Sequence, residues 1–155
     1  MKMKSERGQS LVELAFSILI LVYLLAGAVE FGMIFFQFVQ LRDAAQEGAL
    51  YGSMNPYVDS NLDGAFNVGE PVNQAGIEQR VRAASSSPID LTDPAVIVVA
   101  TSSDSSNRFC EGHGLQVTVS YDHVIFMPFM PQILSTNEIP LTATVIDTIL
   151  RPICP

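Results

Sequence analysis

Side chains that bind hard metal ions recur at alternate positions between residues 59 and 70. Their order matches the calcium-loop pattern D-x-[DN]-x-[DN]-G-x5-E, which begins at Asp59 and ends at Glu70. Calcium takes six to eight oxygen ligands, side chains at the alternate positions converge on one ion, and Gly64 permits the sharp turn between them. The sequence therefore predicts a calcium site with these candidate ligands: Asp59, Asn61, Asp63, the carbonyl of Ala65, Asn67 and Glu70.

A second interpretation of this loop needs no metal. Asp, Asn and Gly favour tight turns in any solvated loop, Pro71 crowds the segment that follows, and the chain has no second loop with which this one could pair. An isolated extracellular loop should bind calcium weakly, with a Kd on the order of 0.1–1 mM, so that its role would be to rigidify the domain. The sequence leaves both interpretations open.

Catalytic patterns are missing from the sequence. His113 and His123 are the only histidines, and there is no Gly-x-Ser-x-Gly elbow, phosphate-binding loop or paired-histidine metal motif. We expect His123 to be a partly buried residue at a strand end. Asp147 should lie toward the opposite end of its own strand, so that the two do not form a dyad. The sequence therefore predicts that the protein is not an enzyme.

Two cysteines, Cys110 and Cys154, form the one pair that the sequence offers. An extracytoplasmic compartment permits a disulfide, and closing a loop of this length would stabilise the fold by about 4 kcal/mol in the chain-entropy model. A metal site would need further ligands, and only His113 lies near in sequence. We predict a disulfide between the two; the alternative is two unrelated thiols.

A long apolar run, Leu14–Phe36, precedes all of these groups and is interrupted only by Ser17 and Glu30. A bilayer core of about 30 Å needs roughly 20 apolar residues of helix, so the run is long enough to span a membrane. We expect one helix from Ser10 to about Tyr51 whose second half leaves the membrane. Pro56 should end it, because proline has no N–H to donate and restricts the residue before it.

The charge distribution predicts the orientation of this helix. Lys2, Lys4 and Arg7 precede the run, whereas Arg42 beyond it is accompanied by acidic residues. The positive-inside rule then places the N-terminus in the cytoplasm and the C-terminal domain outside a single-pass cytoplasmic (inner) membrane. The formal net charge of −8 makes the chain a poor candidate for binding nucleic acid or anionic lipid.

Glu13 lies at the cytoplasmic mouth of the predicted helix. A comparable charge at a helix centre in the membrane costs about 3 kcal/mol on translocon scales. If the chain were cut after Gly8, Gln9 would carry a new α-amino group four residues before Glu13, and that cation could offset the carboxylate. The alternative makes Glu13 an ordinary interfacial residue. A secretory signal would instead be cut after its apolar core.

These residues carry a resemblance to a known family. The segment Arg7–Ala15, Arg-Gly-Gln-Ser-Leu-Val-Glu-Leu-Ala, resembles the TadE-like family of the tight-adherence (Flp) pilus system, and so does the small-residue segment Leu41–Gly52. Gly8, Gln9 and Glu13 ahead of a long apolar helix are similar to the processing signature of type IV pilins. The resemblance implies cleavage between Gly8 and Gln9 by a membrane prepilin peptidase. It also implies a minor-pilin or pseudopilin role, possible presence in a cell-surface pilus, and pilin subunits and the assembly machinery as partners.

The remaining sequence predicts a small extracytoplasmic domain. A short helix from Asn73 to Ala84 should carry an apolar stripe and a solvated face; the stripe is Ile77, Val81 and Ala84, and the solvated face is Glu78, Arg80 and Arg82. Three strands follow, at Ala95–Ala100, Leu115–Ile125 and Ile139–Leu150. The first is continuously apolar, so we expect it to be central or covered on both faces, and the second alternates strictly. A meander with the last strand antiparallel to the middle one brings Cys154 near Cys110.

The fold class predicted is therefore α+β, with a long N-terminal transmembrane helix, a short second helix and a three-stranded antiparallel sheet. The boundaries expected are a cleaved leader at residues 1–8, the helix at residues 9–55, and the outer domain with its calcium-type loop at residues 56–155.

Small residues lie four apart at Gly48 and Gly52 and again at Ala28 and Gly32. This spacing lets helices approach closely. We expect the membrane pair to face neighbouring helices and the outer pair to face the sheet of the same chain.

The sequence allows two interpretations for each of two further features, Glu30 and residues 126–131. Glu30 lies about 25 Å beyond Glu13 along a helix, so it is either an acid at the outer membrane interface or a buried contact with a partner helix. Residues 126–131, Phe-Met-Pro-Phe-Met-Pro, are either a loop folded over the sheet or the long helix, or an exposed contact patch for another pilus subunit.

Two functions from different classes follow from the sequence. One is a TadE-like minor pilin or pseudopilin, processed after Gly8, that takes part in assembling a surface pilus and in adhesion. The alternative is a membrane-anchored binding module that never polymerises and whose outer domain is braced by calcium.

Overall fold

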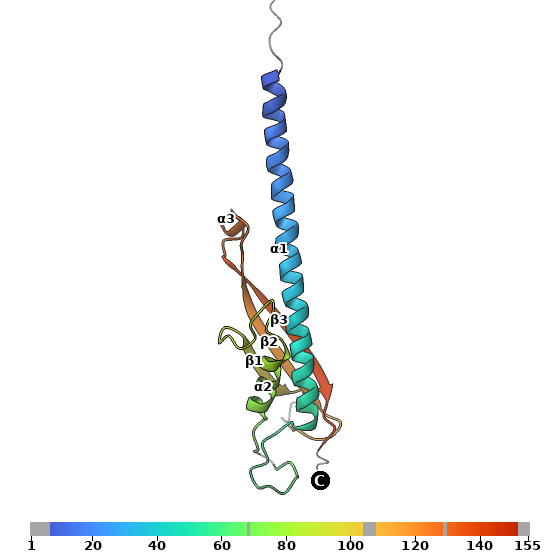
Figure 1. Ribbon diagram of the computed structural model, residues 1–155. Helices are drawn as coiled ribbons and strands as arrows, with labels where there is room; N and C mark the ends of the chain where they lie inside the picture. Colours follow the sequence, from blue (N-terminus) through green and yellow to red (C-terminus); the bar gives the residue numbers. More distant parts are fainter. Residues whose placement is uncertain (1–6, 68, 104–107, 129, 152–155) are drawn as a thin grey trace, which may run out of the picture.

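The computed structural model describes residues 7–67, 69–103, 108–128 and 130–151. Its elements are α1 (Arg7–Met54), α2 (Gln74–Ala84), β1 (Ile97–Ser102), β2 (Gly114–Val124), α3 (Met130–Leu134) and β3 (Glu138–Thr148). In Figure 1 the first half of α1 extends beyond the domain, and the β2–β3 hairpin runs back along α1 with α3 at its tip. The long helix, the short second helix and the three-stranded antiparallel sheet confirm the predicted fold class.

The second half of α1 forms one side of the hydrophobic core. Leu41, Ala45 and Ala49 recur at steps of four residues on one helix face, and all three are fully buried. The helix ends at Met54, directly before Asn55 and Pro56, as predicted. The domain is therefore built onto the end of the same helix that carries the apolar run.

The sheet is the predicted meander. Its strand order is β1-β2-β3 with both pairs antiparallel, and Val117 pairs with Ala100 on one side and Val145 on the other. The alternation of β2 places Leu115, Val117 and Val119 in the core, where they are fully buried. The start of β2 lies beside the end of β3, since Gly114 pairs with Thr148.

The prediction that the first strand is central or covered on both faces was wrong. β1 is an edge strand, in which Val98 and Ala100 are buried while Ile97 and Val99 are exposed. A continuous apolar run predicts a strand but does not specify how many layers cover it. Gln74 of α2 instead bonds the backbone of β1: its Nε2 donates to Val98 O at 2.7 Å, and its Oε1 accepts from Ala100 N at 2.9 Å.

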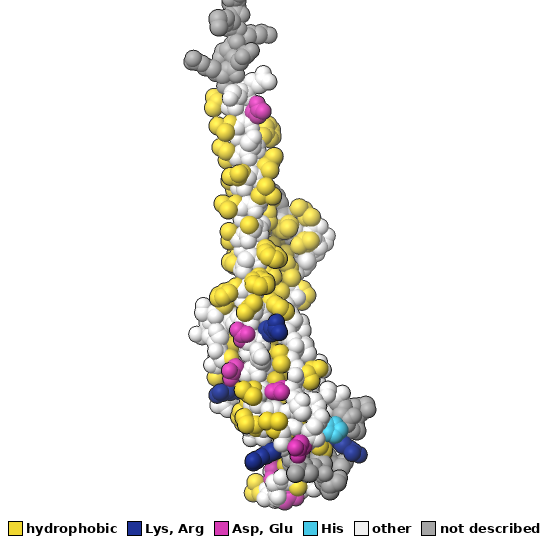
Figure 2. Space-filling model, turned by 90° about the vertical axis from the view of Figure 1, so that its right-hand side faces the viewer, with side chains coloured by type: hydrophobic (Ala, Val, Ile, Leu, Met, Phe, Trp, Pro, Cys, Tyr) yellow, Lys and Arg dark blue, Asp and Glu magenta, His cyan; other side chains and the backbone are white. Residues whose placement is uncertain are grey.

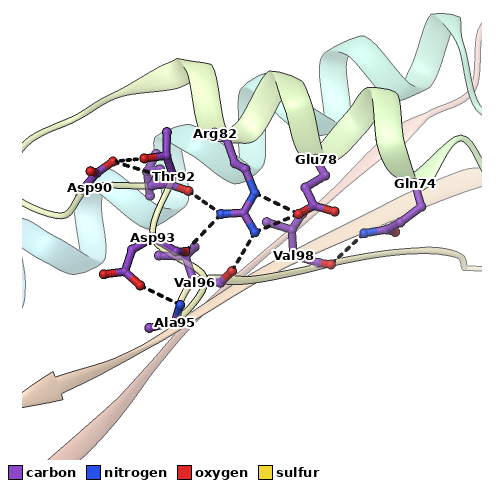
Figure 3. Close-up of polar contacts among 10 residues, drawn as sticks. Gln74, Glu78, Arg82, Asp90, Thr92, Asp93, Ala95, Val96 and Val98 are labelled. Carbon is purple, nitrogen blue, oxygen red and sulfur yellow. Dashed lines mark hydrogen bonds and ion pairs between the residues drawn. The ribbon is translucent and has the colours of Figure 1, made fainter.

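Arg82 does not lie on a solvated face of α2, contrary to prediction. Its guanidinium reaches into the loop before β1 and donates to the carbonyls of Leu91 (2.7 Å), Asp93 (3.1 Å) and Val96 (3.2 Å), as Figure 3 shows. Its Nε also donates to Glu78 Oε1 at 2.8 Å within α2. One side chain therefore fastens the loop to the helix.

The apolar stripe of α2 is shorter than predicted. Ile77 and Val81 are buried, but Ala84, in its last turn, is exposed. The domain core therefore ends one turn before α2 does.

Two glycines set the distance between α1 and the rest of the domain. A Cβ atom at Gly48 would lie 2.5 Å from Val81 Cγ2, and one at Gly52 would collide with the side chain of Leu115. The expectation that this pair faces the chain's own domain is confirmed. Among the described residues no atom lies within 4 Å of an added Cβ at Gly32, so the first half of α1 leaves this small-residue face open.

Candidate functional site

The first half of α1 presents apolar side chains in every direction. Leu11, Phe16, Leu24 and Phe31 are each 67–71% exposed, and Figure 2 shows hydrophobic side chains covering this part of the molecule. Among the described residues, α1 is the one helix long and apolar enough to cross a membrane. An apolar surface of this extent is stable in lipid or against other apolar helices rather than in water. The helix is therefore compatible with single-pass membrane anchoring.

The predicted processing residues lie at the beginning of α1. Gly8, Gln9 and Glu13 are all helical and all exposed. Gln9 and Glu13 are four residues apart and therefore neighbours on one helix face. Residues 1–6 of the predicted leader lie outside the described residues.

Glu30 and His123 form a buried polar contact that the sequence analysis missed. Glu30 is 8% exposed and His123 is 1% exposed, and His123 Nε2 lies 2.9 Å from Glu30 Oε1. The same carboxylate oxygen accepts a hydrogen bond from the backbone N–H of Phe126 at 3.0 Å. The imidazole ring and a backbone N–H therefore meet at one carboxylate oxygen.

This contact corrects two predictions. Glu30 is buried by the β2–β3 hairpin of its own chain, a covering that neither prediction for this residue included. His123 is completely rather than partly buried. A signal was available: the alternation that buries Leu115, Val117 and Val119 places His123 on the same inner face of β2.

His123 and Asp147 are far apart, as predicted. In the β2–β3 register His123 pairs with Ile139 and Asp147 pairs with Leu115, at opposite ends of the two strands. The acidic partner of His123 is Glu30 instead, and the contact between these two side chains joins the β2–β3 hairpin to α1.

The segment after β2 continues along α1 toward the N-terminus. Met127 is 9% exposed and lies 3.9 Å from the position of a Cβ atom on Gly27. The hydroxyl of Tyr23 donates a hydrogen bond to Pro128 O at 2.8 Å. Met127 and Pro128 of the predicted loop at 126–131 therefore lie against the long helix, whereas Phe126 is 74% exposed and Met130 begins α3. Residue 129 lies outside the described residues.

The predicted calcium loop closes on itself through its acidic side chains. Asp59 Oδ1 accepts from Leu62 N at 2.6 Å, and its Oδ2 accepts from Gly64 N at 2.8 Å. The two oxygens of Glu70 accept from Ser60 N at 3.1 Å and Asn67 N at 2.8 Å. The first and last predicted ligands therefore both bind the loop backbone.

The middle predicted ligands are hydrogen-bonded to one another. Asn67 Nδ2 donates to Asp63 Oδ2 at 3.1 Å and to Ala65 O at 3.2 Å. The Ala65 N–H bond and then the Asn67 bond lower the pKa of the Asp63 carboxyl group. Asn61 donates its N–H to Asp59 at 3.2 Å. In the described part of the chain, no group of three or more His, Cys, Asp or Glu side chains is placed to hold a metal ion.

Negative charge accumulates at the base of this loop. The pKa of the Tyr57 hydroxyl is raised first by burial and then by the charges of Asp59, Glu70 and Asp63. A short antiparallel bridge between Tyr57 and Val72 joins the two ends of the loop. Ordered acidic oxygens are what calcium prefers as ligands, so the donor chemistry fits, although Glu70 would have to exchange its N–H partners to become bidentate.

The predicted disulfide remains a prediction. Cys110 is buried at 4% exposure, whereas Cys154 lies outside the described residues. Beside Cys110, Gly112 N donates to Ile149 O at 3.0 Å. The segment that leads toward Cys154 therefore leaves β3 at the correct end of the sheet.

A groove of 740 Å³ between α1 and the segment after α2 was also missed. Its lining includes Phe36, Gln40, Asp43, Glu47 and Pro88. The residues come from segments far apart in the sequence, so no local pattern could have predicted it. The groove therefore lies beside the second half of α1, beyond most of the exposed apolar side chains of its first half.

The family model described as TadE-like protein matches residues 8–50. No curated protein and no solved structure matches the chain. The match begins at Gly8 and ends inside the second half of α1, so it confirms the resemblance for the long helix.

Proposed function

We propose, starting from the TadE-like character of residues 8–50, that this chain is a minor pilin or pseudopilin of a tight-adherence pilus. The observation that carries the proposal is the helix itself: the family match begins at Gly8, and most of the large side chains from Leu11 to Phe36 are apolar and exposed. A helix of this kind must pack in a bilayer, in a filament of similar helices, or in each in turn. The hairpin of the outer domain covers this surface at Tyr23, Gly27 and Glu30 and leaves most of the exposed apolar side chains free for such packing.

Processing after Gly8 is the chemical step that the proposal requires. Cleavage would leave Gln9 with an α-ammonium group one helical turn from Glu13. That cation would offset the Glu13 carboxylate in the same chain or in a neighbouring helix, which lowers the cost of placing the acid in an apolar bundle. The peptidase would act at the cytoplasmic face, with the α+β domain on the other side of the membrane.

The mature chain should begin at Gln9. Protein purified from its native cell envelope is examined by intact mass and N-terminal sequencing, and Gly8→Leu should retain the leader. An added side chain at Gly8 has open space around it, so the substitution should leave the fold unchanged and affect only recognition by the peptidase.

Gly32→Leu is the matched control, because Gly32 is also open but lies far from the cut. It should be processed normally. Retention of Met1 to Gly8 in the native protein would contradict the pilin proposal and favour the anchored binding module.

We further propose that residues 59–70 bind calcium weakly and thereby rigidify the base of the domain. The observation that favours a cation is that three carboxylates, those of Asp59, Asp63 and Glu70, are ordered by hydrogen bonds within one short loop whose ends are joined by the bridge between Tyr57 and Val72. After the larger effect of burial, their charges also raise the pKa of the Tyr57 hydroxyl. With a Kd of about 0.5 mM, calcium at about 5 mM would add roughly 1.4 kcal/mol to the free energy of unfolding.

Calcium should therefore raise the melting temperature of the detergent-solubilised chain, and a chelator should reverse the effect. Asp63→Ala should abolish this calcium response. Asp90→Ala is the matched control, because Asp90 is also an exposed aspartate whose pKa is lowered by hydrogen bonds within a turn, from Thr92. If the unsubstituted chain melts at the same temperature with calcium and with chelator, the proposed calcium site is wrong.

A further inference from the structure

We propose that the tip of the β2–β3 hairpin, of which residues 125–128 and 130–134 are described, inserts into the outer leaflet of the membrane beside α1. The inference depends on α1 crossing a membrane and is independent of the pilus role. It gives the chain a second membrane contact in addition to the helix. In this proposal the exposed side chains of the tip contact the acyl chains of the bilayer.

The height of the tip along α1 is the first observation. Pro128 accepts a hydrogen bond from Tyr23, and Met127 lies against Gly27. Tyr23 lies seven residues before Glu30, which is about 10 Å along a helix. If the helix enters the bilayer near Leu11, about 20 residues of span end near Glu30. The tip then lies about 5–10 Å inside the outer boundary, the usual depth of interfacial insertion.

The chemistry of the tip is the second observation. The sequence from Val124 to Asn137 contains no charged residue. Phe126 and Ile133 are 74% and 72% exposed, and Leu134 is 47% exposed. Figures 1 and 2 together show this tip beside the apolar half of α1, so that the two form one continuous hydrophobic surface. An exposed apolar patch of this kind marks a membrane or protein contact, and here it continues the surface of the anchor.

The polar groups of the tip are the third observation, because backbone groups in lipid must be satisfied within the protein. Phe126 N donates to Glu30, Ile125 N donates to Asn137 O at 3.0 Å, and Pro128 O accepts from Tyr23. Proline at positions 128 and 131 has no N–H to satisfy. The Glu30–His123 contact also keeps the carboxylate nearest the tip paired and away from lipid.

Depth-dependent fluorescence quenching tests the proposal. The chain contains no tryptophan, so single tryptophans are placed by Ile133→Trp at the tip, Leu19→Trp in α1 and Leu150→Trp at the far end of the domain. Leu150 N bonds to Ser53 O near the end of α1, well outside the proposed membrane. Each full-length variant is reconstituted in phosphatidylcholine vesicles with or without bromine on the acyl chains.

We expect Ile133→Trp and Leu19→Trp to emit at shorter wavelength than Leu150→Trp and to lose most of their emission in brominated vesicles. Quenching of Leu19→Trp together with no more quenching of Ile133→Trp than of Leu150→Trp would overturn the proposal while leaving α1 in the membrane. A blue shift of Ile133→Trp that depends on the protein-to-lipid ratio and not on bromine would also overturn it, because a second copy would then cover the tip.

Discussion

Replacing Glu30 by leucine should release the upper end of the β2–β3 hairpin from α1. The His123 ring and the Phe126 N–H share one carboxylate oxygen inside the protein, and both would lose their acceptor. Leaving such groups buried without a partner costs about 3 kcal/mol. Hydrogen exchange of the amides of residues 121–126, measured by mass spectrometry in micelles, should then accelerate by roughly 100-fold.

Three further variants test whether loss of the Glu30 contact causes the faster hydrogen exchange. Glu30→Gln keeps an oxygen acceptor and should lose less protection than Glu30→Leu. Glu30→Leu combined with His123→Leu should recover part of the loss, because no polar side chain then remains buried without a partner. Glu13→Leu changes an exposed acid on the same helix and should leave hairpin exchange unchanged. Equal exchange rates in Glu30→Leu and the unsubstituted chain would show that the contact does not hold the hairpin.

The missed contact explains how far sequence reasoning extends in this chain. The long helix and the β2 strand depend on local periodicity, and both were predicted close to their observed bounds. Glu30 and His123 are 93 positions apart, and no local pattern connects them. Each residue was nevertheless unusual for its element: an acid inside an apolar run and a histidine on the inner face of a strand. When two such residues lie on elements that are expected to face each other, a contact between them can be predicted and tested.

Arg82 and β1 were mispredicted for a related reason. The periodicity of α2 places Arg82 beside Glu78, but only the path of the loop at 91–96 brings carbonyls to its guanidinium. The sequence of β1 specifies a strand, whereas its place at the sheet edge depends on the order of pairing. The loop at 59–70 matches its pattern in order, but the orientation of its oxygens is set by N–H donors that the pattern does not include.

Gly52→Leu should strongly destabilise the outer domain. Even a Cβ atom at this position would meet Leu115, and it would lie 3.0 Å from Ile77 Cδ1, so the helix would have to move away from both the sheet and α2. Overpacking of this kind costs about 3 kcal/mol, which for a domain of this size lowers Tm by about 15 °C. Circular dichroism of the purified chain in micelles during heating measures the shift.

Gly32→Leu separates packing within the chain from packing between chains. No atom lies within 4 Å of an added Cβ at Gly32, so Tm of the domain should stay unchanged. The Ala28–Gly32 face would nevertheless lose its close approach to a neighbouring helix, because small residues at this spacing let helices meet. The variant should therefore fold normally and associate less with other copies or pilin helices in crosslinking. Domain unfolding in Gly32→Leu as large as in Gly52→Leu would contradict the assignment of the two glycines to different partners.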